Sequence, residues 1–445
     1  LISIKYHHYP FLRISAMLKI TTFKRSYLAS RLILKSTTIK RNFAQSVGKV
    51  DDTVGLIGSK TLPISKAMQK ALTTDKPLHD WTQDQIGEIY NTPLHDLLFY
   101  SQLITRKFFN PSEIQFCSLL SIKTGGCTED CKYCAQSSRN HTDVKAEKLL
   151  DLDTVFSQAK KAKQKGATRF CMGSAWRGMH GRKSALKKIS GMVKKINDEL
   201  GMETCVTLGM LDDGQAEVLK KAGLTAYNHN IDTSRNHYKN IISSRTFDDR
   251  LATGKRVQDA GISLCQGGIC GLGETDDDRI SFLHTLCTLK EHPESVPINK
   301  LIPIKGTPLA DELKTKYKGR ELTMEQLLRT IASARLLMPA SIVRLAAGRY
   351  TMKESEQLLI FMAGVNAIFT GEKMLTTMCN GWDEDINMLK KWGFVPMKSF
   401  TRSTPNAHLR INIDSKSKTF SINLAENVPI TERALKEHCE ESGSI

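Results

Sequence analysis

Two features that define large classes of proteins are missing from this 445-residue sequence. It contains no run of about 18 apolar residues, so we expect no membrane-spanning helix. Its 11 cysteines are too few and too irregularly placed for a disulfide scaffold, and they fit metal-bound thiolates in a reducing compartment better. With 40% hydrophobic and 25% charged residues, the composition is that of a soluble globular protein. The length allows one large barrel-type domain with appendages, or two ordinary domains.

Acidic residues are absent from positions 1–48, which are rich in Arg, Lys, Ser, Thr, Leu and Ile. The first 50 residues hold ten Lys or Arg, so they supply more than half of the net charge of +18. This composition is typical of a mitochondrial transit peptide. We therefore predict that residues 1–48 direct the chain to the mitochondrial matrix and are then removed. A nucleic-acid-binding arm is the alternative.

Between residues 111 and 380, apolar β-prone runs alternate with amphipathic helical runs. The predicted strands are Gln115–Ile122, Thr168–Met172, Glu203–Leu208, Thr225–His229, Ser263–Gly268, Ser295–Ile302, Ser341–Leu345 and Val365–Phe369. The predicted helices are Asp153–Lys165, Ser184–Leu200, Asp213–Lys221, Thr246–Asp259, Thr275–Lys290, Thr323–Met338 and Lys353–Met362. This alternation, over about 260 residues, predicts a (β/α)8 barrel of the TIM type. A doubly wound open sheet is the alternative.

The segments on either side complete the predicted domain organisation. Residues 51–110 should form an N-terminal helical cap over one end of the barrel, with helices at Leu78–Tyr90 and Leu94–Leu103 separated by Pro93. Residues 111–380 form the barrel. Residues 381–445 form a C-terminal extension that we expect to be partly disordered, with Met388–Trp392 and Thr431–Cys439 as candidate helices.

The segment that begins at Cys127 carries the clearest chemical signal. Cys127, Cys131 and Cys134 offer three thiolates at the spacing Cys-x3-Cys-x2-Cys, with no fourth cysteine nearby. A 4Fe–4S cluster usually takes four thiolates, so three leave one iron open to another ligand. The spacing resembles the signature of the radical S-adenosylmethionine (SAM) enzymes, in which the open iron chelates the methionine end of SAM. A zinc knuckle is the alternative, and it would need His141 as its fourth ligand.

Three further cysteines fall on predicted strands: Cys171 on the second, Cys205 on the third and Cys265 on the fifth. Inward-facing residues alternate along the strands of a barrel, so three thiols from different strands can meet in its lumen. For each cysteine alone, a buried apolar role is an equally good interpretation. The remaining cysteines show no such pattern, and we expect them to be structural: Cys117, Cys270, Cys287, Cys379 and Cys439.

Polar residues stand at the ends of other predicted strands. The fourth strand ends in Asn228, Asn230 and Asp232, whose amides can bind hydroxyl or ureido groups and whose carboxylate can accept from a ribose. An Asx turn that closes the strand is the alternative. Asn299 ends the sixth strand. Arg344 lies in the otherwise apolar seventh strand, and because a buried Arg is costly unless paired, it should face a charged group in the lumen.

From Leu78 to Thr377 the chain resembles the biotin synthases, and the combination of matching segments is far more specific than the cysteine motif alone. The segments are Leu120–Gly125, Cys127–Cys134 with Gln136–Ser138, Arg169–Gly173, Tyr227–Asn230, Gly267–Ile269 with Gly271–Glu274, Ser295–Asn299, Lys305–Ala310, and Arg344–Leu345 with Ala347–Arg349. The basic leader and the extended tail depart from the family pattern, and they bear on localisation rather than on chemistry.

This resemblance implies two clusters, SAM and a substrate in one site. It implies a 4Fe–4S cluster that cleaves SAM, held by Cys127, Cys131 and Cys134. It implies a second, 2Fe–2S cluster that donates sulfur, held by Cys171, Cys205, Cys265 and Arg344. It places Asn230 and Asp232 at the ribose of SAM, and Asn228 and Asn299 near the substrate ring.

The implied reaction is the insertion of sulfur between two unactivated carbons of dethiobiotin, the last step of biotin synthesis. A positioned acid or base cannot break such C–H bonds, so radical chemistry carried by a cofactor is required. The expected partners are dethiobiotin, an electron donor protein of the ferredoxin or flavodoxin type, the iron–sulfur assembly machinery and a second copy of the chain in a homodimer; we expect no nucleic acid and no membrane. Two alternatives stay open: another radical SAM barrel enzyme, and a basic metal protein that binds nucleic acid.

Overall fold

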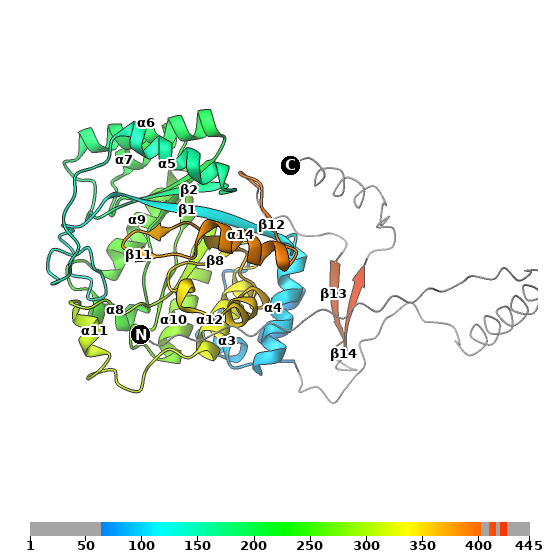
Figure 1. The fold of residues 1–445 in the computed structure, drawn as a ribbon. Helices are drawn as coiled ribbons and strands as arrows, with labels where there is room; N and C mark the ends of the chain where they lie inside the picture. Colours follow the sequence, from blue (N-terminus) through cyan, green and yellow to red (C-terminus); the bar gives the residue numbers. More distant parts are fainter. Residues whose placement is uncertain (1–63, 402–408, 415–418, 425–445) are drawn as a thin grey trace, which may run out of the picture. The chain divides into compact units, whose positions relative to one another are not determined.

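The computed structural model describes residues 64–401, 409–414 and 419–424. At its centre is a closed parallel barrel in the strand order β1-β2-β3-β4-β5-β7-β8-β9, with β9 pairing back to β1 (Figure 1). The strands are β1 (Glu113–Lys123), β2 (Arg169–Ser174), β3 (Glu203–Thr207), β4 (Ala226–Asn228), β5 (Ser263–Cys265), β7 (Ser295–Lys300), β8 (Ile342–Leu345) and β9 (Ala367–Phe369). The closed ring confirms the (β/α)8 architecture that the sequence predicts.

The fifth predicted strand, Ser263–Gly268, differs from the structure because the chain breaks it in two. β5 ends at Cys265, and a separate strand β6 (Gly268–Cys270) pairs with β7. Gly267, between them, packs against the backbone of β7 so closely that a Cβ atom would lie 2.0 Å from the carbonyl oxygen of Pro297. A side chain at that position would therefore force the two strands apart.

Helices cover the outside of the barrel. They are α5 (Leu152–Gln164), α6 (Lys183–Leu200), α7 (Asp213–Lys221), α8 (Arg235–Ile241), α9 (Phe247–Asp259), α10 (Asp276–Cys287), α11 (Pro308–Glu312), α12 (Met324–Leu337) and α13 (Glu354–Met362), with a 3-10 turn at Arg349–Thr351. Capping boxes start α7 at Asp212, α9 at Thr246, α10 at Thr275 and α12 at Thr323. Within the described ranges, no helix has both the length and the apolar character needed to cross a membrane.

From residue 64 on, where the described part of the chain begins, three helices precede the barrel: α2 (Lys66–Thr73), α3 (Gln83–Tyr90) and α4 (Leu94–Phe108). α4 packs on α12 and α3 packs on α10, so the segment predicted as a cap lies against helices of the outer layer. The hydroxyl of Ser101 in α4 donates to the carbonyl oxygen of Ala363 at 2.7 Å, which ties α4 to the end of α13.

The chain beyond the last barrel strand returns to both ends of the barrel. A hairpin of β10 (Lys373–Met374) and β11 (Thr377–Met378) is followed by α14 (Trp382–Lys391) and by β12 (Val395–Pro396), which pairs in parallel with the start of β1. The hydroxyl of Ser399 then donates to the carbonyl oxygen of Thr168 at 2.7 Å, beneath the start of β2. This segment therefore runs past the N-terminal ends of the first strands.

Part of the predicted C-terminal extension forms an antiparallel hairpin, β13 (Leu409–Asp414) with β14 (Thr419–Leu424). The predicted helix at Met388–Trp392 belongs to the longer α14. The predicted transit peptide, residues 1–48, and the candidate helix Thr431–Cys439 lie outside the described residues.

Candidate active site

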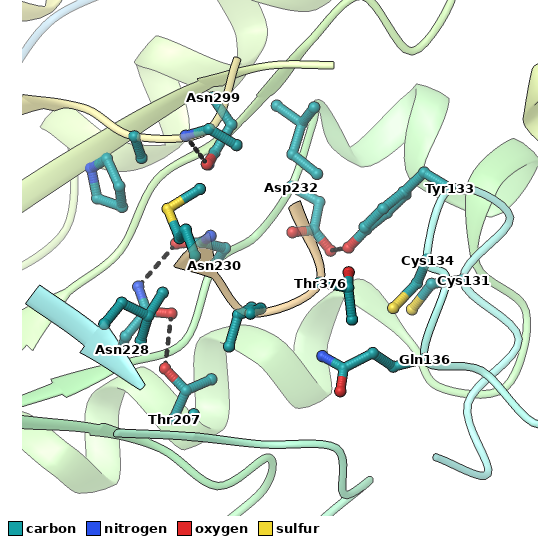
Figure 2. A pocket seen from close by; sticks show the side chains of 18 of the residues that line it. Cys131, Tyr133, Cys134, Gln136, Thr207, Asn228, Asn230, Asp232, Asn299 and Thr376 are labelled. Carbon is teal, nitrogen blue, oxygen red and sulfur yellow. Dashed lines mark hydrogen bonds between the residues drawn. The ribbon is translucent and has the colours of Figure 1, made fainter. Parts of the chain in front are cut away.

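A cavity of about 340 Å³ opens at the C-terminal ends of the barrel strands and reaches into the lumen. Active sites of (β/α)8 barrels lie at this end. The cavity is lined by both groups of cysteines that the sequence singled out, the loop of Cys127, Cys131 and Cys134 and the strand residues Cys171, Cys205 and Cys265. Figure 2 shows Cys131 and Cys134 on one side of this space, with Asn228 and Asn299 across from them.

The cysteine loop (residues 127–134) is closed by its own hydrogen bonds. The amide of Cys127 donates to the carbonyl oxygen of Gln136 at 3.0 Å, and the amide of Ser138 donates back to Cys127 at 2.7 Å. The side-chain amide of Asn140 donates to the carbonyl oxygens of Cys131 and Cys134, at 3.1 and 2.8 Å. These bonds fix the backbone of all three cysteines before any metal is present.

Neighbouring helices anchor the cysteine loop from outside. The carboxylate of Asp130 accepts from the amides of Ser243 and Ser244, each at 3.0 Å, just after α8. The ammonium of Lys132 lies 2.6 Å from the carboxylate of Glu312 at the end of α11. The loop is therefore tied to two elements of the barrel as well as to itself.

The geometry does not favour a zinc site. The sulfurs of a tetrahedral zinc site lie within about 4 Å of one another, because each zinc–sulfur bond is about 2.3 Å long. Among the described residues, no three His, Cys, Asp or Glu side chains meet closely enough to hold a single metal ion. His141, the fourth ligand that a zinc knuckle would need, is exposed and does not line the cavity.

Burial sets the protonation of the loop thiols in the metal-free chain. It raises the pKa of Cys131 to about 12 and the pKa of Cys134 to about 11. Both thiols are therefore protonated at neutral pH, and metal binding must displace their protons. The hydrogen bonds therefore fix the backbone of the loop, whereas burial keeps the Cys131 and Cys134 thiols neutral.

The strand cysteines meet in the lumen as predicted. Cys171 and Cys205 are direct partners across β2 and β3, and Cys265 projects from β5 into the same buried cluster. The thiol of Cys205 is hydrogen-bonded to the thiols of both Cys171 and Cys265. A fourth thiol, Cys117 of β1, belongs to the same cluster and is hydrogen-bonded to Cys171. We expected Cys117 to be structural; the structure packs it with these thiols, although it is not among the residues that line the cavity.

Arg344 completes this lumen group and changes its electrostatics. Its side chain is buried, with Nη1 3.7 Å from the Cys265 sulfur and Nη2 donating to Gln115 Oε1 at 2.5 Å. The hydrogen bond from Cys205 and the Arg344 charge together lower the pKa of Cys265 to about 6. Hydrogen bonds from Cys117 and Cys205 lower the pKa of Cys171 as well. The same hydrogen bonds raise the pKa of Cys205, and burial raises the pKa of Cys117, so the shifts within the lumen group have opposite signs.

The two predicted substrate residues line the cavity with their amides held by neighbours. Asn228 accepts from the Thr207 hydroxyl at 3.1 Å and donates to Asn230 Oδ1 at 3.0 Å (Figure 2). Asn299 donates to the carbonyl oxygen of Gly268 at 2.9 Å. These hydrogen bonds hold both side-chain amides in one orientation at the cavity wall.

Asp232 is the most constrained acid of the site. It is 3% exposed and has a left-handed backbone with a φ of 69°. Arg250 Nη2 donates to its Oδ2 at 2.6 Å, and the Tyr133 hydroxyl of the cysteine loop donates to the same oxygen at 3.0 Å (Figure 2). Both bonds end on Oδ2, so the second oxygen has lone pairs for a ligand.

Several residues of the site were missed by the sequence analysis. Arg245 is nearly buried at the cavity wall, its Nη1 has no hydrogen-bond partner, and its Nε makes only a 3.8 Å contact with Glu129. The hairpin residues Met374–Thr377 line the mouth. The two-residue strands of the hairpin are too short to show a periodic pattern, and Arg245 is a single residue on a loop with no motif around it. Cys117 lies on a predicted strand, so it alone could have been found by the argument used for the other thiols.

Two family models match the chain. The model described as the radical SAM superfamily matches residues 121–286, and the model of the biotin and thiamin synthesis associated domain matches residues 297–395. Together they span the barrel and the segment that returns beneath it.

Curated relatives match with high identity. The mitochondrial biotin synthase of Saccharomyces cerevisiae is 60% identical over 334 residues, which is 75% of this chain and 88% of that protein. The mitochondrial biotin synthase of Emericella nidulans is 52% identical over 377 residues, 84% of this chain and 93% of that protein. That of Arabidopsis thaliana is 52% identical over 336 residues, 76% of this chain and 87% of that protein.

Solved structures of lower identity share the fold. Methylornithine synthase has a TM-score of 0.61 at 16% identity, and the match covers 75% of this chain and 97% of that one. The FeFe-hydrogenase maturase from Carboxydothermus hydrogenoformans has a TM-score of 0.61 at 16% identity, with 83% of each chain covered.

Proposed function

The chain belongs to the biotin synthase family within the radical SAM superfamily, and from this premise we propose how its cavity inserts sulfur into dethiobiotin to form biotin. Membership of the superfamily implies a 4Fe–4S cluster and SAM as cofactors. The observation that carries the proposal is that two groups of thiols, one on a loop and one on the strands, line a single cavity. Another radical SAM enzyme would have no need of both groups together with Arg344.

We assign the cysteine loop to the 4Fe–4S cluster, with Cys127, Cys131 and Cys134 as its three thiolates. When bound, the cluster and SAM supply the 5′-deoxyadenosyl radical, which can abstract hydrogen from an unactivated carbon. The chain would hold the cluster through the three sulfurs of one closed loop, and all three cysteines line the cavity. Tyr133, from the same loop, binds Asp232, so the loop also orients a cavity wall.

The proposed SAM site lies beside this loop. Asn230 and Asp232 would bind the ribose, because the second oxygen of Asp232 remains available while Oδ2 is held by Arg250. Arg245 would bind the carboxylate of SAM, since its buried guanidinium has an unpartnered N–H group at the cavity wall and charge-assisted bonds of this kind are strong.

We place the second, 2Fe–2S cluster in the lumen, held by Cys171, Cys205, Cys265 and Arg344, as the source of the inserted sulfur. Dethiobiotin would lie between the two clusters, with Asn228 and Asn299 at its ureido ring. The β10–β11 hairpin contributes Met374–Thr377 to the lining of the cavity, and excluding water there would protect radicals from quenching.

The test is anaerobic reconstitution of the full chain with iron and sulfide, followed by metal, sulfide and absorbance measurements and by assay of biotin formed from dethiobiotin and SAM. Two cluster types and biotin formation are expected. Cys287→Ala is the matched control, because this buried thiol lies on α10 away from the cavity. A chain with one cluster type and SAM cleavage without biotin would point to another radical SAM reaction.

We propose that the chain acts in the mitochondrial matrix. The basic, acid-free composition of residues 1–48 supports a transit peptide, and the Saccharomyces, Emericella and Arabidopsis relatives are named as mitochondrial proteins. The N-terminal sequence of the protein isolated from cell fractions tests this. An unprocessed cytosolic chain would contradict it.

The proposed protein partners are an electron donor of the ferredoxin or flavodoxin type, the iron–sulfur assembly machinery and a second copy of the chain. One-electron reduction of the 4Fe–4S cluster and replacement of consumed sulfide both require an outside supply. Sedimentation of the reconstituted chain tests the homodimer. SAM cleavage with purified ferredoxin or flavodoxin as the only reductant tests the donor.

A further inference from the structure

The lumen holds one more sulfur than the proposed second cluster needs. Cys117 projects from β1, is fully buried, and belongs to the same cluster of side chains as Cys171, Cys205 and Cys265. It packs in that cluster with Cys171 of the neighbouring strand β2. Cys171, Cys205, Cys265 and Arg344 line the cavity, and Cys117 is packed behind them in the same cluster of side chains. A 2Fe–2S cluster takes four protein ligands, so Cys117 is a fifth candidate.

Cys117 and Arg344 share one partner. The carboxamide oxygen of Gln115 accepts from Arg344 Nη2 at 2.5 Å and from the Cys117 thiol at 3.4 Å. Ala367 of β9 is the register partner of both Arg344 and Gln115, and its small side chain leaves the guanidinium room to reach across to β1. The two candidate donors thus meet at the same side of the lumen.

One nitrogen of the guanidinium is left unpaired: Arg344 Nε is buried and has no hydrogen-bond partner. The other two nitrogens are engaged, Nη2 by Gln115 at 2.5 Å and Nη1 by the Cys265 sulfur at 3.7 Å. An Arg nitrogen must also lose or share a proton before it can bind iron, because its pKa lies above about 12. A thiolate is the softer donor and the usual ligand of iron in such clusters.

We propose that Cys117 is a reserve ligand of the lumen cluster, a fourth thiolate that binds iron in place of Arg344 when the guanidinium is withdrawn. The inference rests on the proposed second cluster and adds a residue to it. It gives the lumen two ligand sets that differ only at the fourth position. The chain can then keep its cluster while Arg344 serves as a hydrogen-bond donor to the sulfides.

The experiment compares Arg344→Leu, Cys117→Ala and the double variant after anaerobic reconstitution. Leu is chosen because it carries no donor atom. Arg344→Leu should keep the second cluster, and its Mössbauer spectrum should show two equivalent irons, since each then has two thiolates and two sulfides. The double variant should hold at least about tenfold less of that cluster, since even the loss of an outer partner costs about that in metal affinity.

Two controls keep the result interpretable. Arg344→Leu combined with Cys287→Ala removes a buried thiol outside the cavity and should keep the cluster. The content of 4Fe–4S cluster and the cleavage of SAM report that the double variant is folded. Cys117→Ala alone should keep the second cluster, because Arg344 remains as its fourth ligand.

Two outcomes would overturn the inference while leaving the proposed function intact. One is a double variant that holds as much second cluster as Arg344→Leu. The other is complete loss of the cluster in Arg344→Leu although Cys117 is present. If the unsubstituted chain itself assembles no second cluster, both the inference and the proposed function are wrong.

Discussion

The cysteine loop and the lumen thiols line the same cavity, but the chain builds them in opposite ways. The loop places three sulfurs within eight residues. Its backbone is fixed by hydrogen bonds to the backbone of Gln136 and Ser138 and to the side-chain amide of Asn140. The lumen collects its sulfurs from four strands, and each depends on the closure of the whole barrel. The loop can therefore form locally, whereas the lumen site exists only in the folded barrel.

The pKa shifts of the thiols also differ between the two groups. Burial raises the pKa of Cys131 and Cys134, so the loop thiols are protonated until metal arrives. In the lumen, hydrogen bonds between thiols and the charge of Arg344 lower the pKa of Cys171 and Cys265. The pKa of Cys205 and of Cys117 is raised, so the lumen thiols are shifted in both directions, whereas the two loop thiols are both raised.

The largest expected effect comes from breaking the loop alone. Cys131→Ala removes one of three iron ligands, so we predict loss of the 4Fe–4S cluster and of all SAM cleavage, and therefore of biotin formation. Cys127→Ala and Cys134→Ala should do the same. Chromatography of 5′-deoxyadenosine measures the effect. Because the lumen is built independently, the absorbance of the second cluster should persist, and normal 5′-deoxyadenosine formation by any of the three variants would refute the assignment.

Breaking the lumen should separate the two halves of the reaction. Cys205→Ala removes the thiol that is hydrogen-bonded to both Cys171 and Cys265. We predict loss of the second cluster and of biotin formation, with SAM cleavage close to the rate of the unsubstituted chain. Assay of both products in one reaction measures this. If biotin were still formed, sulfur would have to come from somewhere other than the lumen.

The comparison also explains what could be predicted from the sequence. The loop is visible as a spacing, because its three ligands lie within one short segment. The lumen group could be predicted only after the fold. The alternation of strands and helices predicted a barrel, and only a barrel brings Cys171, Cys205 and Cys265 together. Cys117 lies on a predicted strand too, and it was set aside because single strands do not reveal which residues point inward.

Other features could not be reached from sequence because they depend on contacts between distant segments. The pairing of Arg344 with Gln115 joins the seventh barrel strand to the first. The return of Ser399 and Phe400 beneath β2 and β3 follows from tertiary packing in a region where the sequence suggested only a weakly structured extension. Charge, propensity and spacing hold no information about such contacts.

A smaller effect is expected from removing the buried ion pairs of Arg169, which lie below the lumen thiols. Arg169 is fully buried below the thiols and forms ion pairs with Glu203 at 2.5 Å and Glu294 at 2.7 Å. Arg169→Met removes the cation from two carboxylates, which should cost about 3–5 kcal/mol of stability. The urea midpoint of the metal-free chain measures it, with Arg235→Met as the control.

The control breaks a comparable but exposed ion pair, because Arg235 lies 2.7 Å from Asp248 with both side chains more than half exposed. Exposed pairs contribute about 0.2–1 kcal/mol, so its midpoint should barely move. Equal shifts in Arg169→Met and Arg235→Met would show that the lumen does not depend on the ion pairs beneath it.

The smallest effect should come from the anchor of the loop. Lys132 and Glu312 form a partly buried ion pair at 2.6 Å, and Glu312→Gln removes its charge while keeping the size of the side chain. The stability cost should stay below about 1 kcal/mol, because a Lys–Gln hydrogen bond remains and the pair is partly solvated. The loop cluster should nevertheless bleach faster in air than in the unsubstituted chain, since the loop opens more often.

The lumen cluster is held by strands that this anchor does not touch, so its absorbance should decay at an unchanged rate. Faster decay of both clusters would show that the loop and the lumen are coupled, which would contradict the independence that their construction implies.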